Sequence, residues 1–229
     1  MRLMTIASGS SGNAGYLGSE RTHLLIDAGI SRRRIVQGLE TADLKPADLA
    51  GVLLTHEHAD HVTGLKVLLK KDPVPLYATA GTLVAIQKKG MLDDYPAERI
   101  HVIRGGEAFS LGDLTVLPLS IDHDAAEPVG YRVTDGGKSA AFLTDLGHAT
   151  PELEAALRDL DALLLESNHD VRMLEAGLSL LAETPHPRGL RAPLERECGP
   201  AALAALPRRS QTGVARASQQ REQSAGTRL

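Results

Sequence analysis

The chain has 229 residues, of which 42% are hydrophobic, so it can form one domain with a buried core, with or without an appended segment. Its net charge of −4 excludes an overall basic field for nucleic acid, although a local basic patch is compatible with it. The single cysteine, Cys198, excludes an internal disulfide framework and a cysteine-rich zinc site. No apolar run approaches the ~18 residues of a membrane span, and the N-terminal apolar stretch is too short for a signal peptide. We therefore expect a cytoplasmic protein with no membrane contact, and leave the oligomeric state open.

Short apolar runs alternate with helical patterns along most of the chain. In chain order these patterns predict a strand over 23–29, a helix over 31–40, a strand over 51–56, a helix over 63–71, a strand over 74–79, a helix over 82–90, hairpins over 109–121 and 129–145, a helix over 150–160 and a strand over 161–167. Ser31 and Thr150 are the expected N-caps of two of the helices. The mixture predicts an α/β sandwich, and the hairpins argue against sheets that are wholly parallel.

The composition changes after Gly177. Residues 178–229 contain eight Arg, no Lys, five Pro and four Glu, so that their net charge is +4 (eight minus four). Little apolar periodicity is left in this segment, and such a sequence cannot bury enough surface to offset its ordering entropy. We therefore expect residues 1–177 to form the domain and residues 178–229 to be a largely disordered tail.

Three histidines and one aspartate lie within six residues directly after an apolar run, namely His56, His58, Asp60 and His61. A loop at a strand end can turn the first two to one side and the last two to the other, and so offer ligands to two metal ions. Neutral imidazoles and carboxylates favour zinc, or manganese and iron where oxygen ligands are more numerous. The alternative is a solvated loop that is rich in histidine but binds no metal.

Further ligands for such a site are expected at the ends of other strands. His123 follows a predicted strand in the stretch SIDHDAAEPVGY, and Asp145 follows another in FLTDLGH. Strand ends that meet at one edge of a sandwich are where a shared site would form, so both side chains are candidate ligands.

The pattern His-x-His-x-Asp-His, followed by His123 and Asp145, resembles that of the metallo-β-lactamase fold hydrolases, which implies an αββα sandwich. The stretches ASGSSGNAGYL, LLIDAG, TDLG and LLESNHD look like those of the YycJ/WalJ-type subfamily, which is similar to DNA exonucleases. The resemblance implies two divalent metal ions, zinc or manganese. In this arrangement His56, His58 and His123 would hold the first ion. Asp60 and His61 would hold the second ion, and Asp145 would bridge the two.

The function that this resemblance implies is hydrolysis of phosphodiester bonds in DNA by a metal-bound hydroxide. Asp60 and Asp145 would be the catalytic carboxylates, and DNA or another phosphodiester the partner. A bridging aspartate suits hard, oxygen-rich substrates and argues against β-lactam hydrolysis. Two alternatives stay open: a thioester hydrolase of the same fold (glyoxalase-type), and a truncated chain that binds metal without catalysis.

Four further residues are candidates for contacts around the metals or the substrate. Ser10 and Asn13 belong to the stretch SGSSGN, which could be an anion-binding nest of backbone amides or a tight hairpin loop. Asp27 could orient a ligand histidine through a hydrogen bond, or be a turn residue before Gly29. His169, in ESNHD, could face the substrate or lie in a plain loop.

The motifs of the subfamily stop after Gly177, so the sandwich is expected to be C-terminally incomplete. The subfamily continues with a Pro-Tyr segment, a Gly-His-Leu-Ser-Asn motif and a last ligand histidine, whereas His186 matches none of these. Codons can be chosen for 179–188 and 191–198 so that one shifted frame encodes Pro-Tyr-Ser-Leu-Lys and Gly-His-Leu-Ser-Asn. This suggests a frameshift, and the alternative is a genuinely divergent tail. Without the last imidazole, we expect one metal to bind tightly and the second weakly.

Overall fold

The computed structural model describes residues 1–165 and 202–204, and within them the strands form two mixed, six-stranded sheets. The first sheet has the strand order β1 (Arg2–Ala7), β2 (Ala14–Gly18), β3 (His23–Ile26), β4 (Leu49–Leu53), β5 (Leu76–Thr79) and β6 (Ile100–Ile103). The second has the order β12 (Ala202–Ala204), β11 (Ala162–Leu165), β10 (Ser139–Leu143), β9 (Val129–Thr134), β8 (Leu114–Ser120) and β7 (Phe109–Leu111). Because β3 to β6 run parallel, their carboxyl ends lie along one edge of the first sheet.

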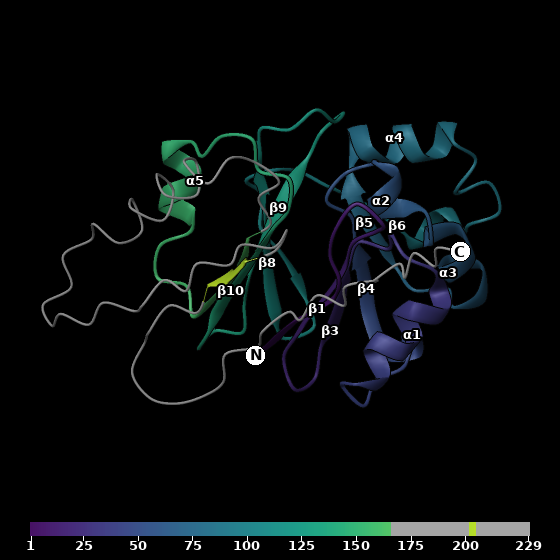
Figure 1. The fold of residues 1–229 in the computed structure, drawn as a ribbon, viewed down its shortest axis with the longest axis horizontal. Coiled ribbons are helices and arrows are strands. Elements are labelled where there is room, and N and C mark those ends of the chain that lie inside the picture. Colours follow the sequence, from purple (N-terminus) through teal and green to yellow (C-terminus); the bar gives the residue numbers. More distant parts are fainter. Residues whose placement is uncertain (166–201, 205–229) are drawn as a thin grey trace, which may run out of the picture.

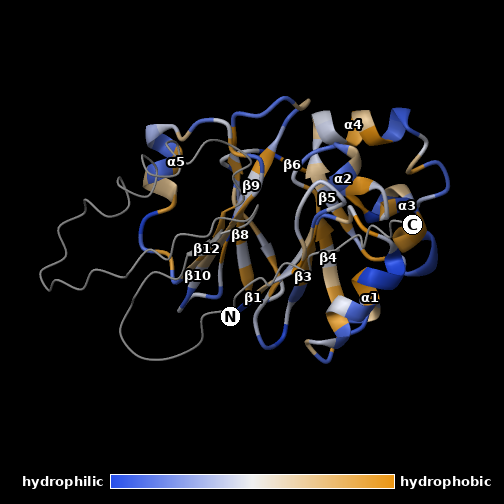
Figure 2. Cartoon of the chain, viewed as in Figure 1, coloured by the Kyte–Doolittle hydropathy of each residue, from blue (hydrophilic) through white to orange (hydrophobic). Residues whose placement is uncertain are grey.

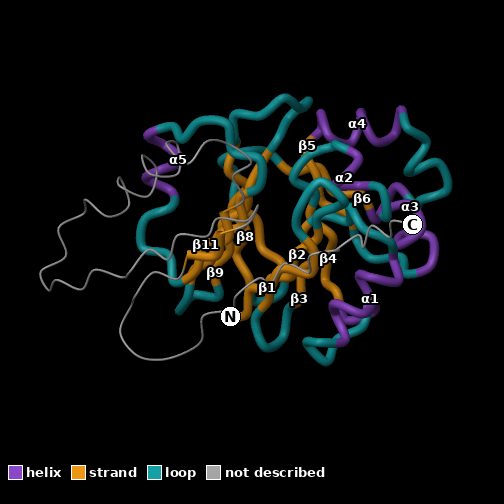
Figure 3. The backbone as a smooth tube through the Cα atoms, in the orientation of Figure 1, coloured by secondary structure: helices purple, strands orange, loops and turns teal. Residues whose placement is uncertain are grey.

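Helices cover the outer faces of both sheets (Figures 1 and 3). The first sheet is covered by α1 (Arg32–Glu40), α3 (Leu65–Lys71) and α4 (Ala80–Lys88), and the second by α5 (Pro151–Ala156). The short helix α2 (Ala59–Val62) follows β4, and two 3₁₀ turns, η1 (Pro46–Asp48) and η2 (Ala97–Arg99), precede β4 and β6. The layers thus follow the order helix, sheet, sheet, helix, which confirms the predicted αββα sandwich.

Apolar side chains fill three layers between these elements. The strands are accordingly largely orange, the colour of hydrophobic residues, in Figure 2. One cluster lies between the first sheet and its helices and includes Ile35 and Leu39 of α1, four residues apart on one helix face. A second cluster lies between the two sheets and includes Leu53 and Phe142. A third packs α5 against the second sheet through Leu153. Burial on both faces of each sheet explains why the strands read as nearly continuous apolar runs.

The predicted helix caps and hairpins are confirmed. Ser31 Oγ accepts a hydrogen bond from the Arg34 N–H (3.4 Å), and Thr150 Oγ1 accepts one from the Leu153 N–H (3.2 Å). The β7–β8 hairpin turns at Gly112, whose φ of +56° belongs to the left-handed region that glycine tolerates best. Local sequence signals were sufficient for these features because caps and turns depend on neighbouring residues.

Three strands of the first sheet were missed: β1, β2 and β6. The sequence of β2, AGYLG, is poor in β-branched residues, and β6 has only four residues, so neither gives a strong strand pattern. In the segment 178–229 the structure describes only β12, which pairs antiparallel with β11. The expectation of a disordered tail otherwise concerns residues outside the described part of the chain.

Candidate metal centre

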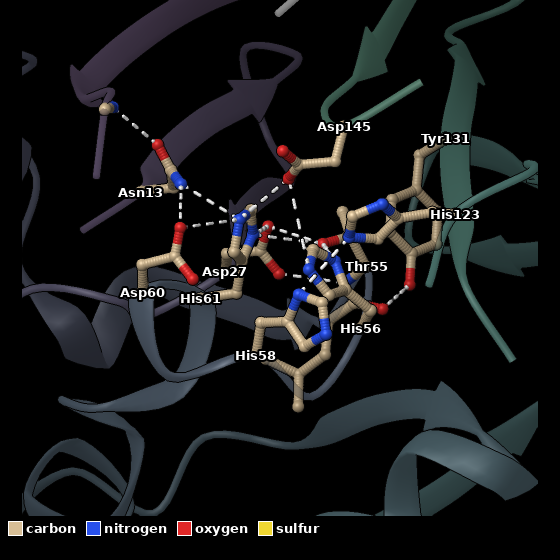
Figure 4. Close-up of polar contacts among 12 residues, drawn as sticks. Asn13, Asp27, Thr55, His56, His58, Asp60, His61, His123, Tyr131 and Asp145 are labelled. Atoms are coloured by element: carbon tan, nitrogen blue, oxygen red, sulfur yellow. Dashed lines mark hydrogen bonds and ion pairs between the residues drawn. The ribbon is translucent and has the colours of Figure 1, made fainter. Parts of the chain in front are cut away.

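The candidate site residues come together at one end of the sandwich, from segments that follow four different strands (Figure 4). Asp27 follows β3, and His56 and His58 follow β4. His123 lies in the connection from β8 to β9, and Asp145 lies just after β10. Both sheets therefore contribute to the same centre.

Three imidazoles form the first group, which consists of His56, His58 and His123. One ring nitrogen from each lies within 4.8 Å of the others, a spacing at which a single cation can contact all three. His58 Nδ1 and His123 Nε2 are 3.3 Å apart. His56 is fully buried, whereas the other two are half-buried and border the solvent.

Two imidazoles and a carboxylate form the second group, which consists of His56, His61 and Asp145. Their ligand atoms also lie within 4.8 Å of one another. Asp145 Oδ2 is 3.0 Å from His61 Nε2 and 3.9 Å from His56 Nε2. Asp60 belongs to neither group: its carboxylate is 36% exposed and lies 3.6 Å from His61 Nε2. His56 is thus shared between the two groups.

A chain of hydrogen bonds orients the two buried imidazoles. Asp27 Oδ2 lies 2.8 Å from His61 Nδ1 and accepts the Thr55 hydroxyl at 2.8 Å. A carboxylate can only accept, so His61 Nδ1 must carry hydrogen. Because the Thr55 hydroxyl donates to Asp27, its oxygen is available to His56 Nδ1 at 3.0 Å as an acceptor. Nε2 of His56 and Nε2 of His61 consequently face the centre, and Asp27 lies against a candidate ligand.

The surroundings of the two buried imidazoles, His56 and His61, shift their pKa values in opposite directions. Burial, together with the neighbouring His61, lowers the pKa of His56 to about 2, so its imidazole is neutral. Burial opposes protonation of His61, but Asp27 and Asp145 outweigh it and raise its pKa to about 10. Burial opposes ionisation of Asp145, yet its hydrogen bond with His61 dominates and its pKa is lowered. Asp145 is therefore ionised at neutral pH.

A divalent cation fits this arrangement. The Nε2 atom of His56 is buried and has no hydrogen-bond partner among the residues that the structure describes. Burying a polar atom without a hydrogen-bond partner costs free energy, and a cation bound to this neutral imidazole nitrogen would remove that cost. Imidazole nitrogens and carboxylate oxygens are the donors that zinc and manganese take.

The stretch 8–13 forms the loop between β1 and β2, which favours the hairpin-loop interpretation of SGSSGN. Asn13 is buried: its Oδ1 accepts the Gly9 N–H (2.8 Å), and its Nδ2 lies 3.2 Å from Asp60 Oδ2 and 2.9 Å from His61 Nε2. Ser10 is exposed at the tip of the loop. His169 lies outside the described residues.

Three residues at the centre were missed by the sequence analysis, namely Thr55, Glu57 and Tyr131. Thr55 joins Asp27 to His56, and the buried Tyr131 hydroxyl donates to the Leu54 carbonyl. Glu57 accepts a hydrogen bond from the loop that carries His123. Thr55 and Glu57 are adjacent to His56 in the sequence, and this adjacency was the only signal that could have indicated them. No sequence signal points to Tyr131.

The family of the chain follows from comparison with known proteins. A model of the beta-lactamase superfamily domain matches residues 22–192, a range that includes every candidate ligand and extends past Gly177. The chain belongs to this superfamily.

Within the superfamily, the chain is similar to proteins that are exodeoxyribonucleases. It is 37% identical over 172 residues to exodeoxyribonuclease WalJ of Streptococcus pneumoniae, which covers 75% of this chain and 64% of that protein. It is 34% identical over 177 residues to exodeoxyribonuclease YycJ of Bacillus anthracis, which covers 77% and 66%. The matches therefore span slightly less than two thirds of the length of these relatives.

A solved structure supports the fold assignment. The zinc-bound PqqB of Methylobacterium extorquens superposes with a TM-score of 0.59 at 26% identity, over 72% of this chain and 64% of that one. A diphosphatase of the PhnP family superposes with a TM-score of 0.55 at 22% identity, which shows the shared fold alone.

Proposed function

We propose that this chain is a divalent-metal-dependent hydrolase that cleaves phosphodiester bonds of DNA, as an exonuclease does. The observation that carries the proposal is the buried Nε2 of His56, which has no partner in the described structure and lies between two groups of ligand atoms. The similarity to two exodeoxyribonucleases supports DNA as the substrate. Among the described residues no helix is long and apolar enough to cross a membrane, and we propose a cytoplasmic location.

The proposed ligand roles use the residues of the two groups and add Asp60. His56, His58 and His123 would hold one ion, and His61 and Asp60 the other, with Asp145 between them because its carboxylate lies near both His56 and His61. Bound divalent cations would supply Lewis-acid activation of water and stabilise the charge that develops on phosphoryl oxygens.

The remaining candidates have roles around the ligands. Asp27 and Thr55 orient His61 and His56, so that their Nε2 atoms face the centre. Asn13 donates to Asp60 and restricts its carboxylate to one orientation. Ser10, exposed on the same loop, and His169 are proposed to contact the substrate. Asp60, partly exposed, and Asp145, mostly buried, are the proposed catalytic carboxylates.

The two metal positions are proposed to differ in affinity. His56 Nε2 can be a ligand of only one ion, and the three-imidazole group uses it fully. The second position then keeps His61, Asp60 and Asp145, and it lacks a further imidazole among the described residues. We propose one tightly bound zinc or manganese ion and a weaker second one.

A substrate panel tests the function. End-labelled linear DNA, bis-p-nitrophenyl phosphate and a glutathione thioester would each be incubated with the chain and Mn²⁺ or Zn²⁺. We expect DNA degradation that stops with a chelator and is absent in His56→Ala. Turnover of the thioester alone would instead establish the glyoxalase-type alternative. The His101→Ala variant is the control, because the half-buried His101 on β6 stacks on Tyr77 and belongs to neither ligand group.

One observation favours a second candidate, a non-catalytic chain that binds a single metal: both ligand groups need His56. One metal per chain without hydrolysis of any substrate would establish it. We relate this candidate to a frameshift near codon 177, which would separate the domain 1–177 from the tail 178–229. Resequencing of the coding DNA tests this origin, because a single base change must restore Gly-His-Leu-Ser-Asn in the shifted frame.

A further inference from the structure

Three hydrogen bonds join the segment that ends in the His-x-His turn to the opposite sheet. The Tyr131 hydroxyl donates to the Leu54 carbonyl, and the Val129 N–H donates to the Thr55 carbonyl (3.0 Å). The third bond is made by a side chain: Glu57 Oε1 accepts the Ala126 N–H (2.8 Å). In one segment the bonded residues run from Leu54 forward to Glu57, toward His58, and in the other from Tyr131 back to Ala126, toward His123.

Glu57 is held at both of its ends. Its carboxylate accepts from Ala126, and its carbonyl accepts from the Lys89 ammonium group at the end of α4 (2.8 Å). Its second carboxylate oxygen, Oε2, is buried and has no hydrogen-bond partner among the described residues. A buried carboxylate oxygen is costly to desolvate, so this contact requires a compensating benefit.

The partner of Glu57 lies in the loop that carries His123. Ala126 is three residues after His123, and the loop joins β8 to β9 in the second sheet. Glu57 itself lies between His56 and His58, which follow β4 of the first sheet. The bond therefore connects the two segments whose imidazoles have ligand atoms within 4.8 Å of one another.

We infer that Glu57 is a positioning residue for the metal position formed by His56, His58 and His123, with a divalent cation as the ligand. Metal–nitrogen distances tolerate changes of only about 0.2 Å. The bond to Ala126 sets the separation between the His-x-His turn and the His123 loop, and so keeps the third imidazole within reach. The inference rests on the metal-binding part of the proposed function.

Matched variants of the full chain test this role through metal binding, without any assay of activity. Glu57→Gln keeps an acceptor oxygen for the Ala126 N–H, whereas Glu57→Ala and Glu57→Met do not, and Glu57→Met keeps the side-chain length. Glu107→Ala is the control, since Glu107 is exposed and its side chain forms a surface ion pair with Arg104 within the described part of the chain. Zn²⁺ affinity would be measured by chelator competition, and coordination by the visible absorption of bound Co²⁺.

We expect Glu57→Ala and Glu57→Met to bind the tight Zn²⁺ about 10–100-fold more weakly, the range known for residues that orient metal ligands. Glu57→Gln and Glu107→Ala should bind as the unaltered chain does, and the Co²⁺ spectrum should change only in the first two variants. Equal affinity in all variants, or an equal loss in Glu57→Gln and Glu57→Met, would overturn the role of Glu57. If the unaltered chain binds no divalent cation, the proposed function fails instead.

Discussion

The turn between β7 and β8 and the metal centre lie at opposite ends of the sandwich, and carboxylates join the two sheets at both. In the turn, Asp113 accepts hydrogen bonds from Thr22 Oγ1 (2.5 Å) and Ser19 Oγ (2.8 Å) and pairs with Arg21 (3.3 Å), all from the connection between β2 and β3. These donors hold the pKa of Asp113 at about 2. Every strong acceptor of this cluster has a donor from the protein.

The metal centre has the opposite balance. Asp27, Asp60 and Asp145 gather around imidazoles, and the buried Nε2 of His56 has no donor in the described structure. A surplus of acceptor atoms in a buried place is stabilised by a cation, whereas matched donors and acceptors need none. The Asp113 cluster, with matched donors and acceptors, is therefore a structural cross-link, whereas the metal centre, with its excess of acceptors, is a binding site.

The largest effect is expected from His56→Ala. The variant removes one of the three imidazoles of the tight metal position, so this position should lose most of its affinity. The loss of Zn²⁺ affinity should exceed the about 10–100-fold typical of residues that only orient ligands. Chelator competition measures it, and retention of tight binding would show that the centre does not use His56.

A smaller effect is expected from Asp27→Asn. Asp27 has φ of +60°, a conformation that Asn also tolerates, so the substitution removes the charge without straining the backbone. Binding at the position of His61 and Asp145 should weaken by about 10–100-fold, because the amide offers His61 Nδ1 a weaker, uncharged acceptor than the carboxylate does. Thr55→Val is the matched variant: it breaks the contact to His56 and should weaken the three-imidazole position more. Equal losses at both positions in both variants would contradict separate roles.

Tyr131→Phe tests a cross-sheet bond that carries no ligand. The buried hydroxyl donates to the Leu54 carbonyl, and its loss leaves that acceptor unsatisfied. The free energy of unfolding, measured with urea, should fall by about 1–3 kcal/mol, while metal affinity changes little. Tyr95→Phe is the control, because the half-buried Tyr95 hydroxyl also donates to a backbone carbonyl, that of Val74, and should cost less.

The smallest effect belongs to the turn, with Asp113→Asn. The folded pKa of about 2 is below the ordinary 3.8, so the ionised carboxylate stabilises the fold above about pH 4 and this contribution is lost as pH falls toward 2. The difference in unfolding free energy between the two chains should be constant from pH 7 to 4 and shrink below it. Urea titrations at several pH values measure this, and a difference that grows on acidification would contradict it. Metal affinity should not change.

Local patterns of the sequence were enough for most elements of the fold and for the composition of the centre. Helix caps such as Ser31, the Gly112 turn and the histidine cluster all depend on residues close together along the chain. The weak strands β2 and β6 could not be predicted, because they acquire their strand conformation from their partners in the sheet, which are β1 and β3 for β2 and β5 for β6.

The sequence by itself determined which kinds of ligand this protein offers, and the two sheets it predicted explain why they meet at one edge. Only the tertiary structure decided which nitrogen of each imidazole faces the centre, that His56 is common to two groups, and that Glu57 reaches the His123 loop. Apart from the local contact of Thr55 with His56, the bonds that set these features join residues 28 to 69 positions apart, as from Thr55 to Asp27 and from Ala126 to Glu57. Their partners are chosen by how the sheets stack, because no local pattern encodes a contact between segments that meet only after folding.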